Sequence, residues 1–116
     1  CTIEFIPYQC GFRAKVELQA IFAGAYPYSK FSKISGFSCQ TIGQDRHGRT
    51  IAQCFLTGDV RGKIDIAIHM VESGWALDWP EYSNAAYGWY MIEPEREKRG
   101  MWEGEFEPPW EWRKGR

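Results

Sequence analysis

Two cysteines on either side of a turn-forming segment are the feature that most constrains the fold of this chain. Residues 37–42 and 50–56 have the composition of strands, and the segment from Ile42 to Arg49 between them has the composition of a turn. Cys39 and Cys54 stand at similar distances from that turn. The sequence therefore predicts a β-hairpin, in which a disulfide between these two cysteines is geometrically reasonable.

The other two cysteines, Cys1 and Cys10, leave the number of disulfides open between two, one and none. An even count of four in a small domain favours bridges in an exported protein, whereas in the cytosol the same thiols would stay reduced. No C-x-x-C pair is present, so the cysteines do not form a zinc pattern. We expect an exported protein, periplasmic or extracellular, although no signal peptide is visible.

Size and composition predict a single domain over residues 1–116. Aromatic residues make up 16% of the chain, which gives a small domain large side chains to bury. The net charge of −1 gives no direct support for nucleic-acid binding, although a local basic patch stays possible. No apolar run approaches the roughly 18 residues of a membrane span.

The first half of the chain predicts short extended segments around one helix. Residues 2–9 are expected to be extended, residues 11–24 to form a helix, and residues 25–36 to form a loop. The segment 63–73 fits a strand or a helix equally well, and Ser73-Gly74 favours the helix because glycine often follows a helix end.

The second half predicts a short strand, a helix and an irregular tail. The strand would run from Trp75 to Trp79, and Ser83 is a suitable N-cap for the helix that follows. Pro94 should kink or divide that helix, because proline cannot donate a backbone hydrogen bond. The tail from Met101 has no regular period, and its tryptophans are expected to pack back on the domain.

The turn Asp45-Arg46-His47-Gly48-Arg49 is the candidate binding element. Gly48 allows the backbone to reverse, and Arg49 leaves the turn at the start of a strand. A guanidinium in a rigid setting suits phosphate, because it donates two parallel charge-assisted hydrogen bonds. Arg49 and Arg46 are therefore predicted to bind substrate. The plainer alternative is a solvated or ion-paired arginine, which is the commoner case for an arginine beside a turn.

The turn belongs to a wider pattern. In order and spacing, four further segments accompany Asp-Arg-His-Gly-Arg: Val71-Glu72-Ser73-Gly74-Trp75-Ala76, Tyr82-Ser83, Arg99-Gly100-Met101-Trp102 and Pro108-Pro109-Trp110-Glu111-Trp112-Arg113. Together they resemble the staphylococcal nuclease (thermonuclease-like) family. The last segment, with Cys10-Gly11, resembles a branch of exported bacterial members. The resemblance is specific from Asp45 to Arg113, looser from Cys10 to Cys39, and covers the later part of the family's domain.

The resemblance implies an α+β fold built on an OB-type, five-stranded barrel with about three helices, here partial because the chain lacks the domain's N-terminal strands. It also implies hydrolysis of phosphodiester bonds in DNA and RNA with Ca²⁺. Arg49 matches the second of the family's two phosphate-binding arginines and would be catalytic, because it stabilises charge that builds on the phosphate. Nucleic acid is the implied partner.

Two family motifs are missing from this chain. The Asp-Gly-Asp-Thr motif and the arginine followed by Asp-x-Pro-Glu supply the metal ligands, the first arginine and the assigned base, and ten residues before the helix cannot hold them. No Ca²⁺ ligand is therefore predicted here, and we expect the chain as given to be inactive. The alternative is a non-catalytic OB-fold module that binds nucleic acid, a protein or a polysaccharide, or that is purely structural.

The remaining candidates have plain structural explanations. His47 and His69 lack partners at metal spacing, so His47 is expected to pack across the turn and His69 to lie on a polar helix face. Trp110 and Trp112 could stack on bases but are expected to close a core. The glutamates of the last helix are expected to form a solvated, ion-paired surface, and they are Glu93, Glu95 and Glu97.

Overall fold

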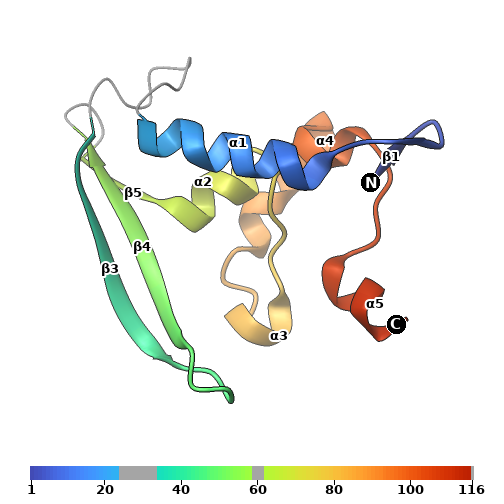
Figure 1. Cartoon of the computed structure of the whole chain (residues 1–116). Coiled ribbons are helices and arrows are strands. Elements are labelled where there is room, and N and C mark those ends of the chain that lie inside the picture. Colours follow the sequence, from blue (N-terminus) through green and yellow to red (C-terminus); the bar gives the residue numbers. More distant parts are fainter. Residues whose placement is uncertain (24–33, 59–61, 116) are drawn as a thin grey trace. The chain divides into compact units, whose positions relative to one another are not determined.

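The computed structural model describes residues 1–23, 34–58 and 62–115, and its fold is mixed α+β, as predicted (Figure 1). These residues cluster into two compact units. The terminal unit contains Cys1–Glu17 and Met70–Arg116, and the hairpin unit contains Leu18–His69. Two helices, α1 (Cys10–Ala23) and α2 (Ile66–Glu72), contribute residues to both units.

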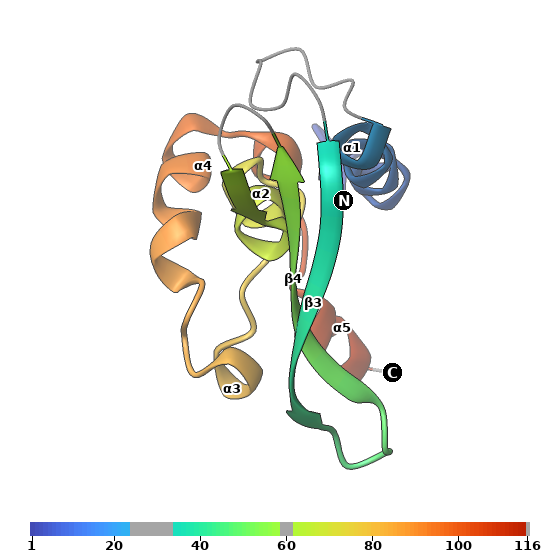
Figure 2. The ribbon, with the colours of Figure 1, turned by 90° about the vertical axis from the view of Figure 1, so that its left-hand side faces the viewer.

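The hairpin unit is built on a three-stranded antiparallel sheet in the order β3-β4-β5 (Figure 2). Its strands are β3 (Ile34–Gln44), β4 (Thr50–Gly58) and β5 (Gly62–Asp65), which confirms the predicted hairpin. The loop predicted over 25–36 is wrong at residues 34–36, because backbone pairing with Gly58 and Thr57 extends β3 to Ile34. Residues 24–33 of that predicted loop lie outside the described residues.

The ambiguous segment 63–73 divides into a strand and a helix. Residues up to Asp65 pair with β4, and α2 begins at Ile66. The carboxylate of Asp65 causes the division, since its Oδ1 accepts hydrogen bonds from the backbone N–H groups of Ala67 (2.9 Å) and Ile68 (3.3 Å). This is the geometry of a helix N-cap. The predicted helix is therefore right for 66–72 and wrong for 63–65.

Apolar packing in the hairpin unit centres on Ile21 and Leu56, which are fully buried. Phe22 of α1 meets Phe37 of β3 edge to face, with 5.5 Å between ring centroids. The helix predicted over 11–24 is confirmed as α1, which begins one residue earlier at Cys10 and is described to Ala23, while residue 24 lies outside the described residues.

The terminal unit begins with a small hairpin of β1 (Thr2–Ile3) and β2 (Ile6–Pro7), so the extended run predicted over 2–9 is right for these two strands and wrong for the turn between them. Its turn residues, Glu4 and Phe5, both have positive φ. Thr2 exchanges two backbone hydrogen bonds with Glu105, of 2.8 and 2.6 Å, so the start of the chain pairs with its later part. A disulfide joins Cys1 to Cys10, which answers the question that the cysteine count left open.

The strand predicted from Trp75 to Trp79 is wrong. These residues form no regular element, and the N–H of Asp78 donates to Sδ of Met91 at 3.3 Å instead of to a neighbouring strand. Ser83 is not an N-cap either, because it is the last residue of α3 (Pro80–Ser83). The chain then turns through Asn84 and Ala85, both with positive φ.

The last predicted helix is divided, and the division falls just before Pro94. A 3₁₀ helix, η1 (Gly88–Met91), leads into α4 (Ile92–Glu97). Pro94 therefore occupies the first turn of α4, where its missing N–H costs nothing. The helix ends at Glu97, and Lys98 directly after it adopts the left-handed conformation. Lys98, Arg99 and Gly100 are the basic residues and the glycine that commonly mark a helix end in the sequence.

The tail is more regular than predicted. It contains a 3₁₀ helix, η2 (Gly100–Glu103), and a short helix, α5 (Pro109–Lys114). The predicted packing of its tryptophans is confirmed for two of them. Trp110 stacks on Trp79 with 5.9 Å between centroids, and Trp102 meets Phe106 edge to face at 5.0 Å.

The strands described here form a two-stranded and a three-stranded antiparallel sheet, and neither closes into a barrel within residues 1–23, 34–58 and 62–115. The same residues form five α-helices and two 3₁₀ helices, where about three helices were predicted. The extra helices have six residues or fewer, so hydrophobic periodicity could not reveal them.

Candidate phosphate-binding site

The turn between β3 and β4 is organised by the carboxylate of Asp45. Its Oδ1 accepts hydrogen bonds from the backbone N–H groups of His47 (2.8 Å) and Arg49 (2.9 Å). The backbone of Asp45 also bonds to Arg49 and Gly48, at 2.9 and 3.0 Å. Gly48 completes the reversal with φ of 82°, a value that glycine adopts without strain.

Arg49 is oriented by the same carboxylate. Its Nε donates to Oδ2 of Asp45 at 2.5 Å, yet its side chain is 74% exposed. Nη1 and Nη2 make no hydrogen bond to any of the described residues. One edge of the guanidinium therefore holds the turn, and the edge formed by the two terminal nitrogens faces solvent, ready for a bidentate contact.

The ion pair has an electrostatic signature. The backbone N–H of Arg49 does most to hold the pKa of Asp45 below its ordinary value of 3.8, burial of the carboxylate opposes the shift, and the Arg49 side chain and the His47 N–H lower the pKa further. Asp45 is therefore ionised at neutral pH. The carboxylate also reduces the positive charge that Arg49 offers to a ligand, although it fixes the direction of the guanidinium.

Arg46 and His47 lie at the exposed tip of the turn. Nε of Arg46 donates to Nε2 of His47 at 3.3 Å, so the histidine contacts its neighbour within the turn. The structure thus places both predicted substrate-binding arginines, Arg46 and Arg49, in the turn from Asp45 to Arg49. The carboxylate of Asp45 orients Arg49, whereas the side chain of Arg46 contacts His47.

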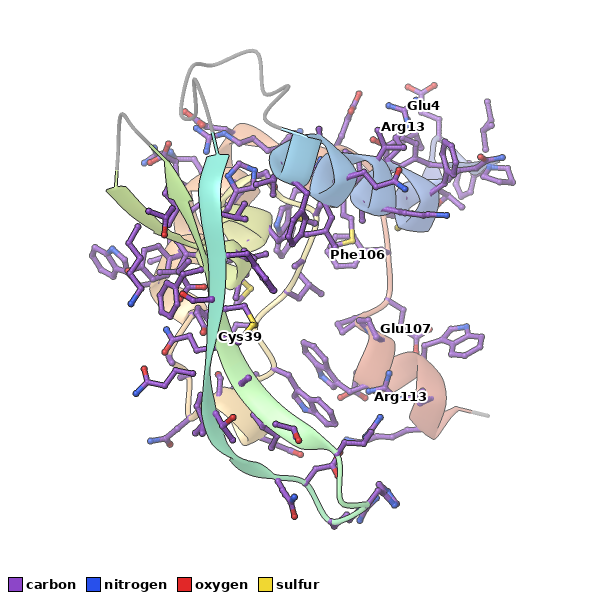
Figure 3. All side chains as sticks on the ribbon, turned by 60° about the vertical axis from the view of Figure 1, so that its left-hand side comes forward. Glu4, Arg13, Cys39, Phe106, Glu107 and Arg113 are labelled. Atoms are coloured by element: carbon purple, nitrogen blue, oxygen red, sulfur yellow. A yellow bond between two sulfur atoms is a disulfide. The ribbon has the colours of Figure 1, made fainter. Side chains whose placement is uncertain are left out.

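A disulfide closes the hairpin that carries this turn. Cys39 and Cys54 are direct cross-strand partners with their Cα atoms 4.1 Å apart, which confirms the predicted pairing. Figure 3 shows the sulfur–sulfur bond beside the label of Cys39 on β3. Both disulfides are of the kind that persists in oxidising compartments.

The two histidines belong to no candidate metal-binding cluster in the described part of the chain. Among the described residues, no group of three His, Cys, Asp or Glu side chains comes close enough together to hold an ion. His69 is 2% exposed, so its predicted place on a polar helix face is wrong. The next two residues of α2, Met70 and Val71, are buried as well, and this part of the helix therefore has no polar face.

Two of the three glutamates of α4, Glu93 and Glu97, form the ion-paired surface that was predicted, and their partner is Arg99. Nη2 of Arg99 contacts Glu93 at 2.6 Å and also pairs with Glu97, and Nη1 donates to the carbonyl of Glu72 at 3.2 Å. Arg99 thus fastens the end of α2 to α4 inside the terminal unit. Its role is structural.

Sequence reasoning missed a pocket in the terminal unit. It is formed mainly by apolar side chains together with two carboxylates, and its walls include Leu77, Asp78, Met91, Trp102, Glu105 and Trp110. Phe106 precedes α5, which carries Arg113 (Figure 3). The pocket is assembled from four segments between residues 77 and 110, and no spacing in the sequence signals such an arrangement. Trp110 lies half-buried in it, as expected of a core residue, while Trp112 is 50% exposed.

Comparison with protein-family models, with curated proteins and with solved structures finds no match for this chain. Among the described residues, no helix has both the length and the apolar character needed to cross a bilayer.

Proposed function

We propose that this chain is the later part of a phosphodiesterase domain of the staphylococcal nuclease type, and that its Arg49 turn binds a phosphate group of DNA or RNA. One observation carries the proposal. The Arg49 guanidinium is aimed by Asp45 from the end of a disulfide-closed hairpin, and its two terminal nitrogens make no hydrogen bond to the described residues.

In this proposal Arg49 stabilises negative charge on the phosphate group. A phosphodiester gains negative charge on its non-bridging oxygens as the attacking water adds, and a prepositioned guanidinium stabilises that charge. The cost of ordering the side chain is already met by the contact with Asp45. Arg46, three residues earlier, would add a second, less ordered contact to the neighbouring phosphate.

Ca²⁺ belongs to the family's chemistry, but the described residues do not fit such an ion, since they offer no cluster of carboxylates. We therefore derive no step through a metal. The proposal assigns no metal ligand and no base to the described residues, and it assigns the three described strands of the hairpin unit to the later part of an OB-type barrel. Export to an oxidising compartment is part of the same proposal, because it is where two disulfides persist.

The test is binding of a fluorescent 12-nucleotide single strand, measured by anisotropy across a series of salt concentrations. Arg49→Ala should weaken binding about tenfold and reduce the salt slope by about 0.7, the value for one phosphate contact on a single strand. Arg49→Lys keeps the charge but loses the fork, so its effect should be intermediate. Arg96→Ala removes an exposed arginine of the terminal unit and should change neither quantity.

Two results would overturn the proposal. One is unchanged binding in Arg49→Ala. The other is robust hydrolysis of DNA by this chain with Ca²⁺, because cutting would require a complete catalytic site within the chain.

A second candidate is a non-catalytic binding or structural module. It is favoured by the ion pair itself, since Asp45 already neutralises Arg49 and the turn is satisfied without any ligand. The same titration separates the two candidates. Absence of any salt-dependent binding at low salt would favour the module.

A further inference from the structure

The pocket of the terminal unit has the size and lining of a small-molecule site. Its volume is about 440 Å³, within the range of pockets that bind organic ligands. Most of its walls are apolar or aromatic, and two carboxylates, Asp78 and Glu105, lie among the lining residues. Among the described residues, no lysine, arginine or histidine lines it. The pocket therefore favours a ligand that is apolar and positively charged.

Asp78 is the unusual member of the lining. It is 3% exposed, and only one of its carboxylate oxygens, Oδ1, has a partner, the hydroxyl of Ser83. Oδ2 is buried and makes no hydrogen bond within the described part of the chain. A buried carboxylate oxygen without a donor is costly, and such atoms usually have a partner in native proteins. Because a carboxylate only accepts, the missing partner is a donor, and a cation suits it best.

Gly88 lies beside that oxygen, and a Cβ at this position would sit 3.6 Å from Oδ2. Because glycine has no side chain, this neighbour supplies no side-chain donor to the carboxylate.

The aromatic walls favour the same kind of ligand. A cation over the face of a tryptophan is attracted by the ring electrons, and Trp102 and Trp110 both line the pocket. Contacts with Phe106 and with Trp79 hold these two rings in place. Nε1 of Trp102 is also buried with no acceptor among the described residues. A ligand that brings an acceptor would satisfy this second polar atom.

We propose that this pocket binds a small organic ammonium ion, an amine on an apolar body that also carries a hydrogen-bond acceptor. The ammonium group donates to Oδ2 of Asp78, the apolar body packs against the tryptophans, and the acceptor receives the N–H of Trp102. This inference is independent of the phosphate site, which lies in the hairpin unit.

The probe is 4-methoxyphenethylamine, which has an ammonium group, an aromatic ring and an ether oxygen. Its control is 4-methoxyphenethyl alcohol, a neutral molecule of the same shape. Binding to the whole chain is followed at neutral pH through the indole N–H signals in a two-dimensional NMR titration, in which Trp102→Phe identifies the signal of Trp102. The amine should bind at least tenfold more tightly than the alcohol and should shift the Trp102 signal. Equal affinities, or no binding of the amine, would overturn the proposal without any need for a variant.

Two variants show which carboxylate causes the preference for the amine over the alcohol. Asp78→Asn keeps the shape of the side chain and removes its charge, so the amine and the alcohol should then bind within about twofold of each other. Glu105→Gln removes the exposed carboxylate of the same pocket and should leave the preference for the amine in place. A preference that persists in Asp78→Asn would contradict the proposed role of Asp78.

Discussion

Replacing Cys39 and Cys54 together with serine removes the disulfide that closes the β3–β4 hairpin. The two cysteines are 15 residues apart in sequence, and a crosslink that closes a loop of this length stabilises the folded state by about 3 kcal/mol through chain entropy. Since 1.36 kcal/mol corresponds to a factor of ten, opening of the hairpin should become on the order of a hundredfold more frequent. Other contacts change little, because Cys39 is exposed.

Amide hydrogen exchange, read by mass spectrometry on peptides from β3 and β4, measures this opening directly. The double variant should lose about a hundredfold of protection in those peptides. Tryptophan fluorescence reports on the terminal unit and can be compared with the exchange of the hairpin unit in the same variant. All six tryptophans lie between residues 75 and 112, in the terminal unit.

A matched control replaces Cys1 and Cys10 with serine. That disulfide spans 9 residues and belongs to the terminal unit, so its loss should cost about 2.5 kcal/mol and leave β3 and β4 protected. The explanation is refuted if replacing Cys39 and Cys54 with serine changes the hydrogen-exchange protection of β3 and β4 by less than threefold. The strand pairing would then hold the hairpin without the crosslink.

Three further predictions concern single positions. Gly74→Ala should destabilise the terminal unit in urea denaturation by more than ~2 kcal/mol, because φ is 84° and the new Cβ would overlap the carbonyl of Arg99. Gly48→Ala should cost only ~1 kcal/mol in hairpin exchange, since its φ is 82° but the space is open. The folded pKa of Asp45 is lowered, so the stabilisation that its carboxylate contributes is complete above pH 3.8 and is lost as pH falls through the folded pKa. The chemical shift of the Arg49 Nε–H should change in that acidic range, because the hydrogen bond to Asp45 is lost there.

The hairpin could be predicted because its signals are local. Strand composition, a turn containing Gly48 and two cysteines placed symmetrically all act within about 20 residues, and the disulfide followed from the same symmetry. Local signals were also decisive for α1 and for the end of α4 at Lys98.

Other elements depend on contacts that the sequence does not display. The segment 63–73 divides because the side chain of Asp65 caps α2 while its other oxygen accepts from Gln53 at 2.8 Å. The predicted strand from Trp75 to Trp79 fails because no neighbouring strand is present among the described residues to pair with it. Helix α5 begins at Pro109 and has six residues, too few for a periodic pattern.

The two candidate sites also differ in whether local sequence signals reveal them. The phosphate-binding turn lies within five consecutive residues, so its residue types and spacing were visible in the sequence. The ammonium pocket brings Asp78 together with Met91, Trp102 and Trp110, and burial of the carboxylate is known only once these segments are folded. Burial of His69 was missed for the same reason.

The most direct test of the central claim is to find where an oligonucleotide touches this chain. A titration of ¹⁵N-labelled protein with a 12-nucleotide thymidylate at low salt reads every backbone amide and the Arg49 Nε–H in one experiment. We expect the largest shifts on residues 45–50 and on the Arg49 side chain, and we expect these shifts to disappear in Arg49→Ala. If the signals of this turn do not shift at concentrations where binding is complete, the proposed binding of phosphate by the Arg49 turn is contradicted.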